Sequence, residues 1–211
     1  MKKEFSSRPE KFTETWGGEF ELFAWQDFVT SIPQPLFVVT GWKSNGKENA
    51  CLQSWASFVS DSGEFICILS YVPTDGHMYK SLKETGVCVL NFPSSDVYEK
   101  CLATIKNNQF ETDEITASGL TAESATVVNA PRIAECFLNI ECRFLWEHKN
   151  FEGSKNTVVA LQAVSISMNN EYYDADKLGR YGKTGYMYNI LANRNPDTGE
   201  VREDTTATIE L

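Results

Sequence analysis

Three apolar runs within residues 36–92 constrain the fold of this chain more than any other feature. Their Val, Ile, Leu and Phe residues are typical of strands, and they cover, in chain order, residues 36–40, 64–69 and 86–92. A polar and aromatic segment, residues 49–55, follows the first run, and a short helix-like segment, residues 77–85, precedes the third. The expected order is therefore strand, loop, strand, helix, strand.

Two longer runs predict a pair of strands in the second half of the chain. Between residues 138 and 146 the even positions are apolar and the odd ones mostly polar, which is typical of a half-buried antiparallel strand. The run over residues 157–166 is apolar on both faces and predicts a more central strand. Because strands dominate over one or two helices, the sequence favours a mainly β fold, a small antiparallel barrel.

A further helix is expected after the third strand. Residues 94–96 are Ser, Ser and Asp, which are typical N-cap residues, and the helix is expected to end near residue 107. Val97, Cys101 and Ile105 are spaced i, i+4, i+8, and this spacing predicts that they line one face of the helix. Turn and breaker residues then predict a surface excursion that lasts until about residue 131.

The length and composition of the chain indicate one compact domain. It has 211 residues, of which 42% are hydrophobic and 12% aromatic, enough for a core of its own. We expect residues 1–32 to be an N-terminal extension that packs on the barrel and residues 33–170 to form the barrel. Residues 171–211 are expected to be a Tyr- and Gly-rich tail that wraps the barrel or a partner subunit.

Charge and targeting signals narrow the possible partners. The formal net charge is −10 and the isoelectric point is near 4.8, so much of the surface repels phosphate backbones and anionic lipids. Neither nucleic acid nor a membrane is therefore expected as a partner. The first residues lack the apolar core of a signal peptide, and no apolar run reaches 18 residues, which favours the cytoplasm.

Several kinds of active site are excluded by missing motifs. The two histidines, His77 and His148, have no partner at metal-ligand spacing, and the six cysteines form no CxxC pair. We expect most of these cysteines to be small buried hydrophobic residues. There is no GxSxG, no GxxxxGK[ST] and no GxGxxG after a strand. The remaining possibility is chemistry carried by a bound group.

The segment of residues 49–55 is the best candidate for holding such a group. A flavin ring is flat and apolar on its faces, while its edge carries atoms that need hydrogen-bond donors. Donors come from Asn49, Gln53 and Ser54, and Trp55 offers a surface to pack on. A phosphate needs hydroxyl, amide or basic groups, and such groups gather near the start of the expected helix: Thr74, His77, Lys80 and Ser81.

These residues also have purely structural interpretations. A segment of Asn, Gln, Ser and Trp is often a surface turn with one anchored aromatic residue, and Cys51 within it can simply face inward. His77 can be an exposed residue at a helix start, and Lys83 can belong to a solvated helix face. From the residues alone, these interpretations stay open beside a flavin site.

Four segments in chain order resemble the flavin reductase-like, FMN-binding split-barrel family, nearest its flavoredoxin branch. They are residues 49–55, residues 77–91, Gly119-Leu120-Thr121, and residues 130–135 leading into Ile140-Glu141-Cys142. The resemblance covers roughly residues 33–190. It implies an antiparallel Greek-key split barrel, a homodimer, and FMN held non-covalently near the subunit interface.

The resemblance also assigns individual residues. Asn49 and Trp55 match the family's residues that touch the flavin. Met78 stands where the family usually has Thr or Ser at the phosphate, so that contact is expected from His77, Lys80 or Ser81. Asn156 falls near a position where relatives often have His, and residues 61–63 are Asp-Ser-Gly where many members have Asp-Pro-Pro.

The resulting expectation is an FMN-dependent oxidoreductase that passes hydride or electrons between NADH or NADPH and an acceptor. The expected cofactor-binding residues are Asn49, Cys51, Gln53, Ser54, Trp55, His77, Lys80, Ser81 and Asn156. No catalytic or metal-binding residue is expected, because hydride can reach a flavin by stacking and proximity. Two alternatives remain: a flavoredoxin-like electron carrier that does not use NAD(P)H directly, and a non-catalytic barrel that binds another planar ligand or a protein.

Overall fold

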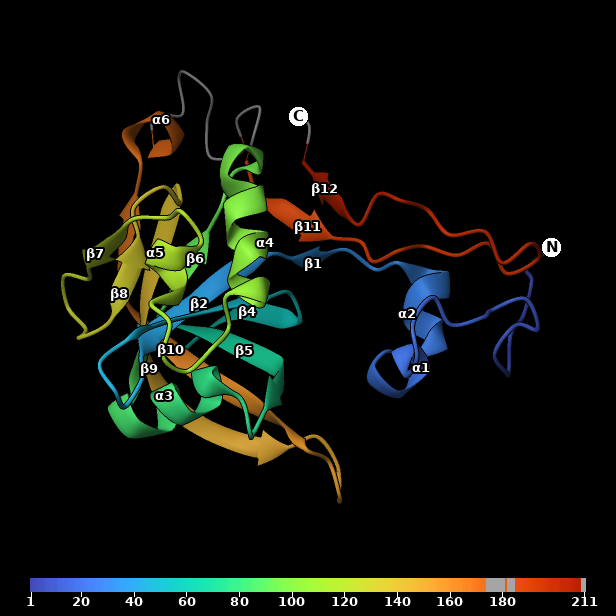
Figure 1. The fold of residues 1–211 in the computed structure, drawn as a ribbon, viewed down its shortest axis with the longest axis horizontal. Coiled ribbons are helices and arrows are strands. Elements are labelled where there is room, and N and C mark those ends of the chain that lie inside the picture. The colour runs from blue at the N-terminus through green and yellow to red at the C-terminus, as the bar shows by residue number, and fades with distance from the viewer. Residues whose placement is uncertain (174–180, 182–184, 210–211) are drawn as a thin grey trace. The chain divides into compact units, whose positions relative to one another are not determined.

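A computed structural model describes residues 1–173, 181 and 185–209 (Figure 1). The chain divides into two compact units. One comprises residues 35–187 with 208–211, and the other comprises residues 1–34 with 188–207. Part of the expected Tyr- and Gly-rich tail, residues 174–180 and 182–184, lies outside the described residues.

The larger unit is built on a seven-stranded sheet in the order β3-β2-β6-β9-β10-β5-β4. Neighbouring strands pair antiparallel throughout this sheet. The strands are β2 (Phe37–Trp42), β3 (Glu48–Gln53), β4 (Ala56–Asp61), β5 (Glu64–Pro73), β6 (Val87–Phe92), β9 (Leu138–Lys149) and β10 (Asn156–Met168). The strands expected from the apolar runs are confirmed, and β10 lies between two partners, as its apolar residues predicted.

The two edge strands of the sheet, β3 and β4, are consecutive in the chain and joined only by Ser54 and Trp55. Seven flat strands would place these edges about 29 Å apart, whereas three Cα steps reach at most about 11 Å. The sheet must therefore curl until its edges come close. β3 and β4 do not pair with each other in the sheet order, so the barrel is open along this seam. The expected antiparallel split barrel is confirmed.

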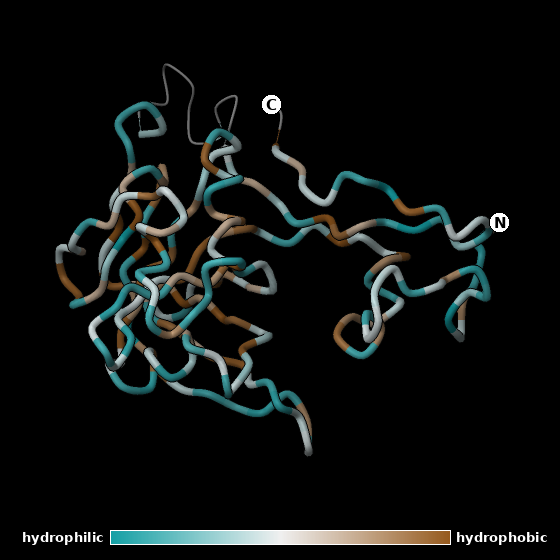
Figure 2. Tube along the Cα trace, in the orientation of Figure 1, coloured by the Kyte–Doolittle hydropathy of each residue, from teal (hydrophilic) through white to brown (hydrophobic). Residues whose placement is uncertain are grey.

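Alternate side chains of the strands fill the inside of the barrel. Phe37 of β2 and Phe58 of β4 meet across the curled sheet, with ring centroids 5.8 Å apart. Helix α3 (His77–Thr85), confirmed at its expected bounds, contributes Met78 and Leu82 to this interior. The other buried members include Val39, Leu69, Leu90, Ile140, Cys142, Val159 and Leu161. Figure 2 shows hydrophobic residues along the barrel strands and hydrophilic residues in many of the connecting loops.

The excursion over residues 95–133 covers the outer face of β2, β3, β6 and β9 (Figure 1). It contains a 3-10 turn (Ser95–Val97), α4 (Tyr98–Lys106), α5 (Glu114–Ala117), β7 (Ala122–Ser124) and β8 (Pro131–Ile133). Val38 and Ala50 on the outer face pack against a buried group that includes Cys101 and Ile115. The expected half-burial of the strand at 138–146 is therefore wrong for its first residues, because Leu138–Cys142 are buried on both faces.

Two expectations for the helix after β6 are also wrong. Neither Ser94 nor Val97 makes a side-chain cap hydrogen bond. Ile105 is 59% exposed, while Cys101 and Thr104 form the buried face. The cause is geometric: each four-residue step turns about 40° beyond a full helical turn, so an i, i+4, i+8 series drifts off one face.

The smaller unit has Arg194 at its centre, with only 1% of the residue exposed. Its guanidinium lies 4.6 Å from the ring centroid of Phe28 and donates to Glu19 Oε1 at 2.5 Å. This unit contains α1 (Glu19–Leu22) and α2 (Trp25–Thr30). The remaining short elements of the chain are β1 (Gln34–Pro35), α6 (Asn170–Tyr173), β11 (Met187–Asn189) and β12 (Thr206–Thr208). Among the described residues, no helix has the length and apolar character needed to cross a membrane.

Candidate functional site

The segment expected as a polar loop is mainly a strand, because residues 48–53 pair with β2 along their whole length. Asn49, Cys51 and Gln53 alternate along β3 and therefore share one face, the inner one, on which Cys51 packs against the interior core. Asn49 and Gln53 are both buried. The Asn49 amide donates to Ser81 Oγ at 3.2 Å, and the Gln53 amide approaches Cys51 Sγ at 3.5 Å. The expected ring-edge donors thus have partners inside the barrel.

Cys51 is a protonated thiol at neutral pH. Burial raises its pKa to about 11, and the hydrogen bond from Gln53 offsets only part of this effect. A thiol with so high a pKa is a poor nucleophile. Cys51 therefore contributes shape and apolar surface to the inner face of β3.

Ser54 and Trp55 form the short link at the seam of the barrel. Ser54 is buried. The Trp55 ring lies 5.4 Å from the Tyr71 ring, and the Trp55 carbonyl accepts hydrogen bonds from the amide and hydroxyl of Ser70, both at 2.9 Å. Trp55 is thus fixed against β5 and presents an aromatic surface beside the seam.

A small hollow of about 40 Å³ lies at the start of α3. Its lining consists of Lys43, Ser44, His77, Lys80, Ser81, Glu84 and Phe110. The structure thus brings together three of the four residues that the sequence proposed for a phosphate, His77, Lys80 and Ser81, and leaves Thr74 outside the lining. Met78 points elsewhere, into the barrel core, where only 6% of it is exposed.

The first turn of α3 also has groups suited to an anion. Its N-cap residue is Gly76, which has no side chain that could cap the helix. The first amides of a helix lack intrahelical acceptors and carry a partial positive charge. A phosphate monoester bound beside His77 and Lys80 would meet donors of the required kind.

A buried ion pair, which sequence reasoning missed, contributes Lys43 to the lining of the hollow. Lys43 Nζ lies 2.8 Å from Glu114 Oε1, and both side chains are almost completely buried. Lys43 Nζ also donates to the carbonyls of Gln109 and Thr112, and Glu114 Oε2 accepts from the Ala50 amide at 2.7 Å. Lys43 and Glu114 are 71 positions apart, so no spacing rule connects them.

Asn156 lies near the start of α3 but outside the lining of the hollow. It begins β10 opposite Pro73, and its backbone amide donates to Ser154 Oγ at 3.1 Å. The adjacent Thr74 donates from its amide and its hydroxyl to the Lys155 carbonyl. Asn156 is therefore next to the turn that leads into the helix.

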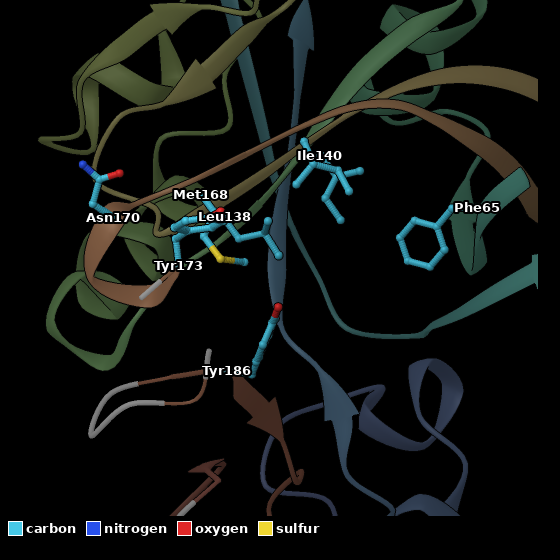
Figure 3. A pocket seen from close by; sticks show the side chains of 8 residues that line it. Phe65, Leu138, Ile140, Met168, Asn170, Tyr173 and Tyr186 are labelled. Atoms are coloured by element: carbon cyan, nitrogen blue, oxygen red, sulfur yellow. The ribbon is translucent and has the colours of Figure 1, made fainter. Parts of the chain in front are cut away.

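A larger apolar cavity of about 630 Å³ lies at the other end of β6 and β9 (Figure 3). Leu138 in its wall pairs with Phe92 at the end of β6, whereas α3 precedes the start of that strand. The wall is formed by Phe65, Leu138, Ile140, Ile166, Met168, Asn170, Tyr173 and Tyr186. A cavity of this size can hold a small organic ligand, while the hollow at α3 is large enough only for a small polar group.

These features define a flavin-type split barrel, and comparison with known proteins agrees. Residues 29–187 match the flavin reductase like domain, and the chain belongs to this family. The family expected from the sequence is thereby confirmed, and membership implies a flavin cofactor.

Solved structures of the same fold include component B of nitrilotriacetate monooxygenase from Bacillus cereus. It is 16% identical, with a TM-score of 0.76 over 100% of this chain and 98% of that one. Flavoredoxin of Desulfovibrio vulgaris is 18% identical, with a TM-score of 0.66 over 85% and 89%. Flavoredoxin from Methanosarcina acetivorans is 21% identical, with a TM-score of 0.62 over 86% and 88%. At such identities the likeness shows the fold.

Proposed function

We propose that this protein is an FMN-dependent oxidoreductase that passes hydride or electrons between NAD(P)H and an acceptor. The observation that carries the proposal is the grouping of His77, Lys80 and Ser81 around one hollow within a flavin reductase like domain. The hollow is small, includes the basic side chains of His77 and Lys80 in its lining and suits one phosphate monoester, which favours FMN over the longer diphosphate of FAD.

In this proposal the protein supplies binding and orientation. His77, Lys80 and the first amides of α3 hold the phosphate. Ser81 and Asn49 keep α3 and β3 together through their 3.2 Å hydrogen bond. Trp55 offers an aromatic surface near the seam. The flavin, when bound, supplies the hydride or electron transfer, so no side chain needs to act as a general acid or base.

We also propose that the protein is a homodimer, as the family resemblance implies, and that it is cytoplasmic. The net charge of −10 supports partners other than nucleic acid or membranes. Light scattering during size-exclusion chromatography tests the dimer directly. A monomer at working concentration would contradict this part of the proposal.

Absorbance spectroscopy tests the cofactor. Purified protein, incubated with FMN and passed through a gel-filtration column, should keep flavin absorbance near 450 nm, a general property of oxidised flavins. FAD and riboflavin are run in parallel to compare affinities. A colourless protein after FMN treatment would overturn the proposal and favour a barrel that binds some other ligand.

Anaerobic mixing of the FMN-loaded protein with NADH, and separately with NADPH, tests the reaction. Bleaching of the flavin by either nucleotide supports a reductase. Bleaching only by a reduced protein donor supports the electron carrier instead, a function compatible with the shared fold of the two flavoredoxins.

A pair of substitutions tests the position of the ring. Trp55→Ala should weaken FMN binding by about tenfold, because loss of an aromatic contact costs on the order of 1–1.5 kcal/mol. Lys83→Ala serves as the matched control, since Lys83 lies toward the other end of α3 and pairs with Glu147 at the surface. Equal losses of affinity in the two variants would contradict the proposed ring position.

A further inference from the structure

The three candidate phosphate contacts on α3 differ in what they can offer a ligand. Ser81 is 3% exposed, and its hydroxyl oxygen already accepts from Asn49. Lys80 is exposed, so water and salt screen its charge. His77 lines the hollow, and its Nδ1 atom is buried. Of the two basic contacts, His77 is therefore the one whose position the fold controls more closely.

The buried Lys43 beside the hollow has no donor left for a phosphate. An ammonium group has three N–H donors. Those of Lys43 are used by the carbonyls of Gln109 and Thr112, at 2.9 and 2.6 Å, and by Glu114 Oε1 at 2.8 Å. Lys43 thus holds the segment around residues 109–114 in place and fixes the position of the Glu114 carboxyl group.

Glu114 in turn orients His77. The Nδ1 atom of His77 lies 3.6 Å from Glu114 Oε1 and has no hydrogen-bond partner among the described residues. The ring of Phe110 lies edge-on to the imidazole, with centroids 5.7 Å apart. A nearby carboxylate favours a proton on the nitrogen that faces it. In neutral His77 the other nitrogen, Nε2, then carries a lone pair and cannot donate.

We propose that His77 is a protonation-dependent contact for the cofactor phosphate, with Glu114 as its positioning residue. This inference rests on the proposed function. When His77 is neutral, its Nε2 presents a lone pair that repels phosphate oxygens. When His77 takes up a proton, Nε2–H becomes a charged donor, while Nδ1–H remains directed at Glu114.

The charges around the hollow make this single proton important. Lys43, which lines the hollow, forms a buried pair with Glu114, which does not, and the two other charged lining residues, Lys80 and Glu84, are also of opposite sign. These four groups sum to zero, so protonation of His77 gives the hollow a net positive charge. Binding of the phosphate should therefore take up a proton between pH 5 and 8, where histidine side chains generally change charge.

Binding constants across pH test the proposal. Dissociation constants for FMN and riboflavin, which lacks the phosphate, are measured from pH 5.5 to 8.5 for the wild type and His77→Gln. The matched control is His148→Gln, which changes the only other histidine, on β9. The phosphate itself ionises near pH 6, and comparison with His77→Gln removes this contribution because both proteins bind the same ligand.

At pH 6 the wild type should bind FMN about tenfold more tightly than His77→Gln, the effect of one hydrogen bond to a charged group. This ratio should fall towards one at pH 8.5. Riboflavin affinities should agree at every pH, and His148→Gln should behave like the wild type. A ratio independent of pH, or an equal loss for riboflavin, would overturn the role of His77 while leaving FMN binding intact. Failure of the wild type to bind either flavin would instead overturn the proposed function.

Imidazole NMR on the wild type gives a second test that needs no variant. With two histidines in the chain, both resonances can be assigned. At pH 7, FMN should move the His77 signals towards the protonated form, and riboflavin should not. Identical His77 spectra with the two ligands would overturn the proposal, even if His77→Gln failed to fold.

Discussion

The inner face of the barrel sheet and the part of its outer face under the excursion are both buried, yet different interactions stabilise them. The inner face is filled by apolar side chains such as Phe37, Leu90 and Leu161. The outer face, under the excursion, carries buried polar residues that include Asn91, Asn139 and Glu141. Apolar packing is non-directional, whereas buried polar groups need partners at defined positions. The outer face therefore specifies where the excursion docks, and the inner face supplies bulk stability.

Asn91 is the centre of one polar cluster on the outer face. Its amide nitrogen donates to the Val38 carbonyl and to Thr40 Oγ1, both at 2.9 Å. Its oxygen accepts from the Ile133 amide and from Asn139 Nδ2, also both at 2.9 Å. One side chain thus links β2, β8 and β9 to its own strand, β6.

Glu141 anchors another part of the excursion. Its carboxylate accepts from the amides of Thr126, Val127 and Val128 at 2.7–2.9 Å and from the Thr126 hydroxyl at 2.6 Å. Burial alone would raise the pKa of Glu141, but these four hydrogen bonds outweigh it, and the pKa lies below its ordinary value. The ionised carboxylate is therefore part of the native packing.

The largest effect is expected from Phe37→Ala on the inner face. Phe37 is fully buried and contacts the rings of Phe58 and Phe92. The cavity should lower the free energy of unfolding by about 3–5 kcal/mol, measured by urea denaturation. Phe151→Ala is the control, because Phe151 is 70% exposed, and it should cost less than about 0.5 kcal/mol. Similar losses in the two variants would contradict the inner-face packing.

A smaller loss, with a distinct pH dependence, is expected from Glu141→Gln on the outer face. An amide cannot accept from all four donors, and the lost hydrogen bonds should cost about 2–3 kcal/mol near pH 7. The pKa of Glu141 is lower in the folded state than in the unfolded state. The carboxylate therefore contributes its full stabilisation above the unfolded-state pKa, and this stabilisation is lost as the pH falls through the folded-state pKa.

The difference in stability between wild type and Glu141→Gln should therefore shrink below about pH 4.5, as measured by urea denaturation at several pH values. Glu123→Gln is the matched control, because Glu123, in β7, is an exposed residue that pairs with Arg132. A difference that stays constant down to pH 3 would show that Glu141 acts through its shape instead of its charge.

The strands that form the inner face were largely predictable from the sequence, because apolar runs and the alternation of apolar and polar residues indicate which side chains are buried. The runs at 64–69 and 86–92 correspond to β5 and β6, and the helix-like segment expected at 77–85 is α3 at its observed bounds. The outer face was not predictable in this way. Asn139 and Glu141 are polar residues of an alternating strand, so the sequence pattern predicts that they face solvent. They are buried because the excursion, which is distant in sequence, covers them.

The candidate site shows the same division. The local cluster His77, Lys80 and Ser81 was predictable because the three residues share one short helix. The segment expected as a polar loop became a strand, because its pairing with β2 depends on a partner outside the segment. No local sequence pattern predicts that Lys43 and Glu114 pair, since the pairing requires the excursion to fold back on the barrel.

The smallest effects are expected from α4, which covers the outer face. Cys101 is fully buried beside Ile115, while Ile105 is 59% exposed. Cys101→Ala should lower the free energy of unfolding by about 1 kcal/mol, because a small buried apolar group is lost. Ile105→Ala removes more side-chain atoms, yet it should change stability by less than about 0.5 kcal/mol because water already reaches that residue. Urea denaturation of both variants shows which of the two losses of stability is larger. A larger loss for Ile105→Ala would mean that α4 docks on the sheet through the i, i+4, i+8 stripe expected from the sequence, and that the outer face is covered differently.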